Sequence, residues 1–171
     1  MGITRQRKEY TGKIPEISHK ELVKRAFAYL KFSLNCSVVF KERVASGSEN
    51  PDAIGFHGGF SYLIECKSTR SDFLADAKKL FRKIPSQGMG GKRYYMAPVG
   101  LLQPSAIPEG WGLLEVYGVP PGLRNRTVKK AKESEYFQAR NASAEIAYLV
   151  SAIRRLDISM AVFVDNTEFM S

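Results

Sequence analysis

The chain has 171 residues, and its 26 Lys and Arg against 17 Asp and Glu give a net charge of +9, which favours polyanionic partners such as nucleic acid. Its hydrophobic content of 44%, with ten Phe and eight Tyr, argues against a disordered chain, because such chains are poor in aromatic residues. No apolar run reaches the roughly 18 residues of a membrane span, and the N-terminus lacks the apolar stretch of a signal peptide, so we expect a cytoplasmic protein.

A basic arm and a helix are predicted at the start of the chain. Residues 1–13 hold several basic side chains and few apolar ones, so we expect a flexible basic arm in front of a single domain over 14–171. Ser18 and Glu21 form a capping box, and apolar residues then recur at helical spacing. A helix is therefore predicted to begin at Ser18.

The rest of the chain predicts five strands and two helices. Strands are indicated by β-branched, aromatic or alternating apolar runs bounded by Gly, Pro and Asn, and helices by apolar residues at helical spacing. The predicted strands cover 36–45, two runs within 51–67, 92–98 and 111–118, and the predicted helices cover 69–84 and 142–155. The last helix carries an apolar stripe of Ile146, Leu149, Val150 and Ile153.

Two basic clusters are candidates for contact with a nucleic-acid backbone. One lies on the polar face of the predicted helix 69–84, and the other precedes the last helix. A solvated protein surface is the alternative interpretation of both. The candidate DNA-binding residues are Lys78, Lys79, Arg82, Lys83, Arg124, Arg126, Lys129 and Lys130.

The stretch "PDAIGFHGGFSYLIECK" at 51–67 predicts a hairpin that brings two carboxylates together. Gly58-Gly59 suits a two-residue turn, and opposed residues then have numbers that sum to 117, so Asp52 faces Glu65. Because strand side chains alternate, Glu65 and Lys67 share a face. Opposed like charges destabilise a ladder and force one carboxyl toward protonation unless a cation lies between them. Carboxylate oxygens, waters and a phosphate are ligands that Mg²⁺ prefers, so the hairpin is a candidate Mg²⁺ site.

A simpler interpretation of the same residues needs no metal. Asp52 after a proline is common in turns, and Glu65 with Lys67 could form a weak ion pair at an exposed strand. The joint occurrence of all three residues in one register favours the metal site.

These residues resemble the motif of the PD-(D/E)xK nuclease superfamily. Pro51-Asp52 is followed, thirteen residues on from the Asp, by Glu65-Cys66-Lys67, and the predicted order of elements over 18–98 is similar to the core of that family. The resemblance is to small bacterial and phage members, including repair-type nucleases. It implies an α/β protein of restriction-endonuclease-like fold, with an αβββαβ core and a mixed central sheet flanked by helices.

The resemblance also implies roles for individual residues. Asp52 and Glu65 would bind Mg²⁺, with Mn²⁺ as a substitute, and the backbone carbonyl of Cys66 would complete the metal shell. Lys67 would orient or activate the attacking water. Many members add a carboxylate from the first helix, for which Glu21 is the candidate, although its place in the capping box explains this residue equally well.

The function implied is that of a metal-dependent deoxyribonuclease, with a role in DNA repair, phage or restriction functions. The alternative is a non-catalytic nucleic-acid-binding protein of the nuclease fold. A third candidate, a basic RNA- or DNA-binding module, has support only in "KRYYM" and leaves the opposed carboxylates unexplained. A homodimer is compatible with cleavage of both strands of a duplex, which commonly needs two sites.

Overall fold

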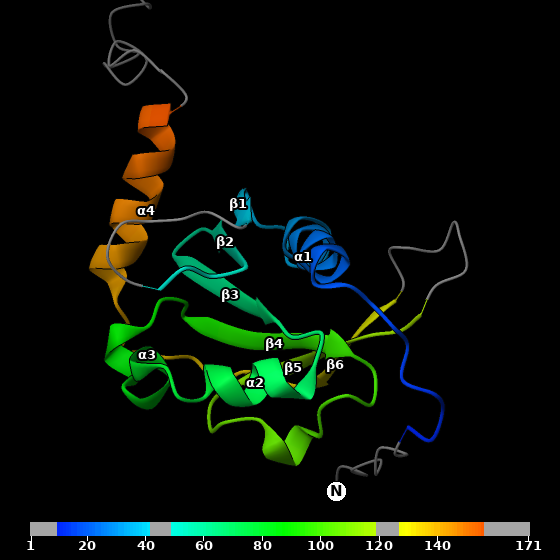
Figure 1. Cartoon of the computed structure of the whole chain (residues 1–171). Helices are drawn as coiled ribbons and strands as arrows, with labels where there is room; N and C mark the ends of the chain where they lie inside the picture. Colours follow the sequence, from blue (N-terminus) through cyan, green and yellow to red (C-terminus); the bar gives the residue numbers. More distant parts are fainter. Residues whose placement is uncertain (1–9, 42–48, 119–126, 156–171) are drawn as a thin grey trace, which may run out of the picture.

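The computed structural model describes residues 10–41, 49–118 and 127–155. A six-stranded sheet in the order β1-β2-β3-β4-β5-β6 lies at its centre, and helices flank both faces (Figure 1). The sheet is mixed, because the β3–β4 and β4–β5 pairs are parallel while the others are antiparallel. The strands are β1 Val38–Lys41, β2 Ala53–His57, β3 Phe60–Cys66, β4 Lys92–Pro98, β5 Gly112–Val116 and β6 Val128–Lys132. The predicted α/β class with a mixed central sheet is therefore confirmed.

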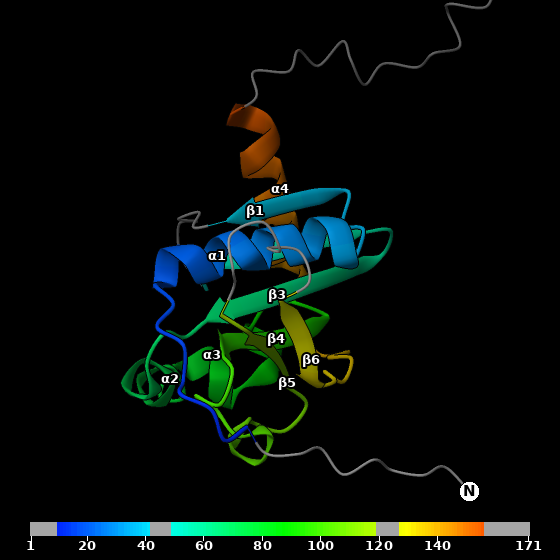
Figure 2. The same ribbon diagram turned by 90° about the vertical axis from the view of Figure 1, so that its right-hand side faces the viewer.

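Helix α1 covers one face of the sheet, and α2 with α3 lies on the other (Figures 1 and 2). The face under α1 holds one apolar cluster, which includes Leu22, Leu30 and Ile64. The opposite face holds a second cluster, which includes Leu63 and Tyr95. The helices are α1 His19–Ala28, continued by a π-helical turn at Tyr29–Ser33, then α2 Arg70–Asp76, α3 Leu80–Lys83 and α4 Ala142–Arg155, with short 3-10 turns at Pro85–Gln87 and Pro104–Ala106. None of the helices in the described ranges is both long and apolar enough to cross a membrane.

The predicted hairpin has the predicted register. His57 pairs with Phe60 and Gly55 pairs with Tyr62, so the numbers of opposed residues sum to 117 as expected. Gly58 has a φ of 55°, the left-handed conformation that such a turn requires. The faces are also as predicted, since Ile64 and Cys66 pack in the cluster under α1 while Leu63 packs in the opposite cluster.

The single helix predicted over 69–84 is wrong, because the chain forms two short helices there. Thr69 caps α2 by accepting a hydrogen bond from the backbone N–H of Asp72, but α2 ends at Asp76, and Lys79 has extended backbone before α3. The break has a structural consequence. Asp76 and Arg82 are six residues apart and would face different sides of a continuous helix, yet here Arg82 Nε lies 2.6 Å from Asp76 Oδ2.

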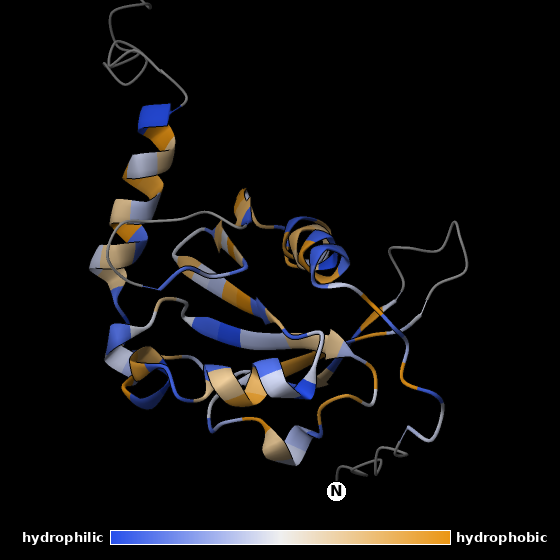
Figure 3. Cartoon of the chain, in the orientation of Figure 1, coloured by the Kyte–Doolittle hydropathy of each residue, from blue (hydrophilic) through white to orange (hydrophobic). Residues whose placement is uncertain are grey.

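The last helix has the predicted bounds, but its apolar stripe does not face the core. Ile146 is 61% exposed, and Val150 and Ile153 are also exposed. The buried face instead carries Glu145 and Tyr148, and Glu145 Oε1 accepts hydrogen bonds from the Ser61 hydroxyl and from the backbone N–H of Gly90. Figure 3 shows the apolar bands along α4 where it extends away from the sheet. The hydrogen bonds of Glu145 and the packing of Tyr148 in the apolar core together hold this side of α4 against the sheet.

The second basic cluster lies partly on an edge strand that the sequence did not predict. Lys129 and Lys130 belong to β6, which pairs only with β5 among the described strands. Lysines are common on edge strands, where they oppose pairing with another chain. The other two members of the cluster, Arg124 and Arg126, and most of the predicted arm at 1–13 lie outside the described residues.

Candidate active site

Asp52 immediately precedes β2 and lies next to the C-terminal end of β3, where the hairpin register places it beside Glu65. The last pair of the ladder toward that end is Ala53 with Ile64, so Asp52 and Glu65 occupy the next position. The carboxylate of Asp52 is held in place there, because its Oδ2 accepts a hydrogen bond of 2.7 Å from the backbone N–H of Cys66. Oδ1 lies 3.4 Å from Nε2 of His19, and the Asp52 side chain is 20% exposed. Asp52 therefore combines a fixed position with access to solvent.

Glu65 is buried and incompletely satisfied. Its side chain is 3% exposed, and its Oε2 lies 3.3 Å from Nζ of Lys67. Its Oε1 lies 3.0 Å from Nη2 of Arg82 but accepts no hydrogen bond of acceptable geometry, so this contact is an ion pair by distance alone. Burial raises the pKa of Glu65 to about 7, since it outweighs the opposing charge of Arg82, and the charge of Asp52 adds to the rise. Burial, more than the opposed carboxylate, thus drives this side chain toward protonation.

Lys67 is held between two carboxylates. Its Nζ lies 3.3 Å from Glu65 Oε2 and 3.3 Å from Asp76 Oδ1. Burial lowers the pKa of Lys67, but the charges of Glu65 and Asp76 outweigh it and raise the pKa above its ordinary value. Lys67 therefore stays protonated at neutral pH and presents a fixed positive charge beside Glu65.

Asp76, at the end of α2, is the anchor for Lys67. It is buried, and its Oδ2 accepts hydrogen bonds from Arg82 Nε at 2.6 Å and from the Tyr95 hydroxyl at 2.8 Å. Its Oδ1 lies 2.8 Å from Nζ of Lys79. Burial alone would raise the pKa of Asp76, but the hydrogen bonds from Arg82 and Lys79 hold it well below its ordinary value. Asp76 is therefore ionised and rigidly placed.

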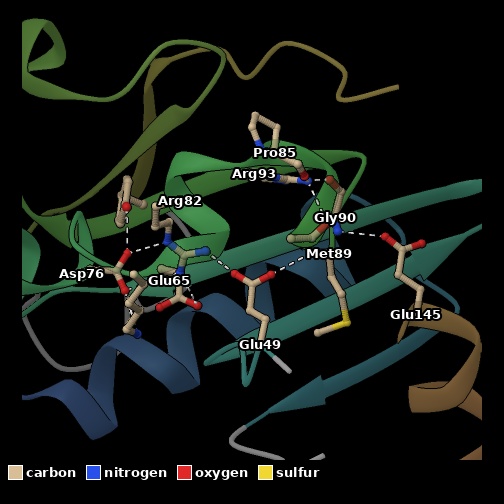
Figure 4. A network of polar contacts seen from close by, with 12 residues as sticks. Glu49, Glu65, Asp76, Arg82, Pro85, Met89, Gly90, Arg93 and Glu145 are labelled. Atoms are coloured by element: carbon tan, nitrogen blue, oxygen red, sulfur yellow. Dashed lines mark hydrogen bonds and ion pairs between the residues drawn. The ribbon is translucent and has the colours of Figure 1, made fainter. Parts of the chain in front are cut away.

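Arg82 joins three carboxylates on this side of the sheet (Figure 4). Its side chain is 3% exposed and forms ion pairs with Glu49, Glu65 and Asp76. Its guanidinium also lies over the Trp111 ring, 4.6 Å from the centroid. Burial lowers the pKa of Arg82, but the charges of Glu65 and Glu49 raise it well above its ordinary value. Arg82 is thus a permanent internal cation.

The structure brings together three of the predicted site residues, and the fourth, Glu21, makes its contacts with other residues. Asp52, Glu65 and Lys67 lie at the same end of β3, as predicted. Glu21 donates its backbone N–H to the Ser18 side chain and accepts a hydrogen bond from Arg25 at its carboxylate. Ser18 thus caps the helix, whereas the Glu21 carboxylate pairs with Arg25, and neither contact joins Glu21 to the carboxylate cluster. The Cys66 side chain packs in the apolar cluster under α1, and its backbone N–H holds Asp52.

One predicted DNA-binding residue is misplaced. Arg82 is not on a basic surface, since its side chain is buried against Glu49, Glu65 and Asp76. The reason is the break between α2 and α3, which turns Arg82 inward. The other described members of the two clusters are exposed, namely Lys78, Lys79, Lys83, Lys129 and Lys130. Two of them also form ion pairs, Lys79 with Asp76 and Lys130 with Glu133.

Sequence reasoning missed the residues that surround the predicted trio. Glu49, Asp76 and Tyr95 come from three separate segments, and only their packing joins them. A signal was available for Asp76, which lies three residues after the core residue Phe73 and so shares its helix face. For Glu49 and Arg82 the sequence holds no comparable signal.

The carboxylate oxygens at the C-terminal end of β3 are of the type that Mg²⁺ binds. Within the described ranges, no group of three or more His, Cys, Asp or Glu is arranged to hold a metal ion. Mg²⁺, however, is usually bound by only one or two carboxylates and keeps several waters and substrate phosphates as its other ligands. Asp52 and Glu65 supply two carboxylates, and Glu65 Oε1 is a buried oxygen that accepts no hydrogen bond. These residues therefore fit the chemistry of Mg²⁺.

The raised pKa of Glu65 predicts a pH-dependent stability in the absence of metal. Between about pH 4.5 and about 7 the folded state binds a proton that the unfolded state releases, so the contribution of Glu65 to stability is lost as pH rises through about 7. Replacement by Gln removes this titration. We expect the free energy of unfolding of the wild type, relative to Glu65→Gln, to fall by about 2–3 kcal/mol from about pH 5 to about pH 8.

Urea unfolding of both proteins in EDTA at the two pH values measures this difference. A difference between the two proteins that does not change with pH would show that Glu65 titrates at its ordinary pKa.

Comparison with known proteins identifies a fold but no family. No family model matches the chain, and no curated protein matches it. A solved structure, described as the SPO1766 protein of unknown function from Silicibacter pomeroyi, is similar over 83% of this chain and 91% of its own length, with a TM-score of 0.57. At 21% sequence identity this similarity shows a shared fold. The shared fold assigns no activity to the chain.

Proposed function

We propose that this protein is a Mg²⁺-dependent deoxyribonuclease of restriction-endonuclease-like fold, which hydrolyses DNA phosphodiester bonds. The observation that carries the proposal is the position of Asp52 at the end of β3, beside the buried Glu65 and the ion-paired Lys67. The order α1, β1, β2, β3, α2 and β4 supports it, since it is the order that the sequence motif implies. The net charge of +9 suits a polyanionic substrate.

Asp52 and Glu65 would hold the Mg²⁺ ion. The bound ion would supply Lewis-acid polarisation of the phosphate and lower the pKa of a bound water. Lys67, next to Glu65, would offset negative charge that develops on a phosphate during hydrolysis. Asp76 keeps Lys67 in place and protonated, and the Cys66 N–H orients Asp52. The chain thus preorganises charge at this site.

A cleavage assay with the full chain tests the proposal. The protein is incubated with supercoiled plasmid, linear duplex and labelled single-stranded DNA in Mg²⁺, Mn²⁺ or EDTA. We expect cleavage of at least one DNA substrate in Mg²⁺ or Mn²⁺ and none in EDTA. Cleavage that persists in EDTA would contradict the proposed chemistry, while the form of the products would distinguish internal from terminal cutting.

Replacement of Lys67 by Met is expected to lower the cleavage rate by about 10²-fold, which is typical for loss of one preorganised charge-stabilising group. DNA affinity in a gel-shift assay should change little, because Lys67 is buried beside Glu65 and Asp76. Lys24→Met, at an exposed position of α1 outside both basic clusters, is the matched control and should cut at nearly the wild-type rate. A Lys67→Met protein as active as the control would exclude Lys67 from the reaction.

A non-catalytic DNA-binding protein is the second candidate, and one observation favours it. Lys67, Lys79 and Arg82 already compensate the charges of Glu65 and Asp76, so the cluster does not need a metal ion for its own stability. This candidate predicts gel shifts of DNA that are the same in Mg²⁺ and in EDTA, with no cleavage of any substrate.

A further inference from the structure

Helix α3 exposes apolar side chains because Arg82, in the same helix, faces inward. The guanidinium of Arg82 pairs with three buried carboxylates. Successive residues of a helix are rotated by about 100°, so the residues two before and two after Arg82 point to nearly the opposite side. Those residues are Leu80 and Ile84, whose exposed fractions are 58% and 39%. The ion pairs of Arg82 thus turn two apolar side chains toward the surface.

Leu80 and Ile84 are neighbours on this surface. The backbone N–H of Ile84 donates a hydrogen bond of 2.9 Å to the carbonyl of Leu80, so the two residues lie one helical turn apart. A singly exposed apolar residue is ordinary on a protein surface, whereas adjacent ones are candidates for contact with a partner. We call these two residues the α3 patch.

Lysines flank the α3 patch. Lys79 directly precedes Leu80, Lys83 directly precedes Ile84, and both lysines are exposed. The stretch 77–88 contains four basic residues and no Asp or Glu. A second copy of the chain docked here about a two-fold axis would bring these lysines against each other, which disfavours self-association. The charge instead suits a polyanion.

The α3 patch adjoins the candidate active site. Nζ of Lys79 lies 2.8 Å from Oδ1 of Asp76, and Nζ of Lys67 lies 3.3 Å from the same oxygen. Helices α2 and α3 lie on the same side of the sheet (Figure 1). A DNA strand with a phosphate beside Lys67 therefore has its neighbouring nucleotides within reach of Lys79 and of the α3 patch.

The apolar character of the patch distinguishes between forms of DNA. The outside of a duplex consists largely of phosphates and sugars, and the faces of its bases are stacked inside. Unpaired bases expose their faces, on which apolar side chains pack while cations hold the backbone. An apolar surface next to lysines therefore gains contact area with unpaired bases and little with an intact duplex.

From these contacts we propose that the α3 patch packs against unpaired bases while Lys79 and Lys83 contact the phosphates, so that the substrate class is DNA with a single-stranded segment. The inference rests on the proposed function, because it names the substrate of the same site.

Fluorescence anisotropy of the full chain in EDTA measures DNA binding without cleavage. The probes are a labelled single strand and the duplex of the same sequence, at one salt concentration. The wild type is expected to bind the single strand at least about tenfold more tightly than the duplex. Equal affinities, or a preference for the duplex, would overturn the inference and leave the proposed nuclease standing.

A double variant, Leu80→Ser with Ile84→Ser, tests the patch itself. Its affinity for the single strand is expected to fall by about tenfold, within the range that a side chain packed on a base contributes, while its duplex affinity stays unchanged. Phe32→Ser is the matched control, since Phe32 is 64% exposed in the π-helical turn that continues α1, which covers the other face of the sheet. It should bind both probes as the wild type does.

The other outcomes of the double variant are equally decisive. No loss of single-strand affinity would exclude the patch from the contact. An equal loss for both probes would indicate an apolar wedge in a duplex and overturn the inference. A wild type that is dimeric by light scattering, with a monomeric double variant, would show that a second copy covers the patch and would also overturn it.

Lys83→Gln tests the phosphate contact separately. Its affinity for both probes is expected to fall, and the slope of log affinity against log salt concentration should decrease by about 1. An unchanged slope would exclude Lys83 from the phosphate contact that the inference requires. The predicted single-strand preference without cleavage of any DNA in Mg²⁺ would support the α3 patch as a binding surface and overturn the proposed nuclease.

Discussion

Replacement of Asp52 by Asn is expected to abolish metal-dependent DNA cleavage, with a loss of about 10³-fold or more, at the upper end of what removal of one charge-stabilising group costs. The Asn side chain keeps an oxygen that can accept the hydrogen bond of 2.7 Å from the Cys66 N–H, so the end of β3 should stay intact. What is lost is the negative charge toward a metal ion. Cleavage rates of wild type and variant, measured across Mg²⁺ concentrations, give the size of the effect.

Asp72→Asn is the matched control for this experiment. Asp72 lies in the first turn of α2, is exposed, and its carboxylate accepts a hydrogen bond from the Ser68 hydroxyl outside the carboxylate cluster. This variant should cleave DNA at a rate close to that of the wild type. If Asp52→Asn cleaves as fast as Asp72→Asn, the active site does not lie at the end of β3.

Replacement of Arg82 by Met is expected to lower the free energy of unfolding by about 3–5 kcal/mol, the usual cost of removing one partner from a buried ion pair. The Met side chain fills part of the volume next to Trp111, but Glu49 and Glu65 lose their cation. Those two buried carboxylates must then stay charged without a partner or take up protons. Urea unfolding at neutral pH, followed by circular dichroism, measures the change.

Lys83→Met is the control on the same short helix. Lys83 is exposed, so its replacement should change the free energy of unfolding by no more than about 0.5 kcal/mol. The destabilised Arg82→Met protein should also recover part of its stability at lower pH, because protonation removes the uncompensated charges of Glu49 and Glu65. Equal stability of the two variants would show that the Arg82 ion pairs contribute nothing to folding.

The hairpin that carries the candidate site was predictable because its signals are local. Gly58-Gly59 determines the turn, and the alternation of side chains along a strand then determines which residues oppose each other and which share a face. Asp52, Glu65 and Lys67 could therefore be placed at one end of the sheet from sequence alone. The bounds of β4 and α4 were equally accessible, since propensity and periodicity act over short ranges.

The network around these three residues could not be predicted in the same way. Arg82 looks like one of several surface cations when the segment 69–84 is taken as one helix, and its burial depends on the break between α2 and α3. Its partners Glu49 and Asp76 come from other segments of the chain. Whether a charged side chain is solvated or buried depends on which opposite charges the fold brings to it, and that is a non-local property.

Local sequence signals were sufficient to predict the α/β class, the hairpin register and the helix at 142–155. Long-range packing determines which face of α4 meets the sheet, where Glu145 accepts hydrogen bonds from Ser61 and from the Gly90 N–H. Long-range packing also places Arg82 against the buried carboxylates. Periodicity shows that a helix has an apolar side, but the burial of a side chain depends on the surfaces that segments distant in sequence present to it. Secondary-structure elements were predictable because they depend on interactions between residues close in sequence. The environment of the charged residues at the candidate site was not, because it depends on contacts between segments that are distant in sequence.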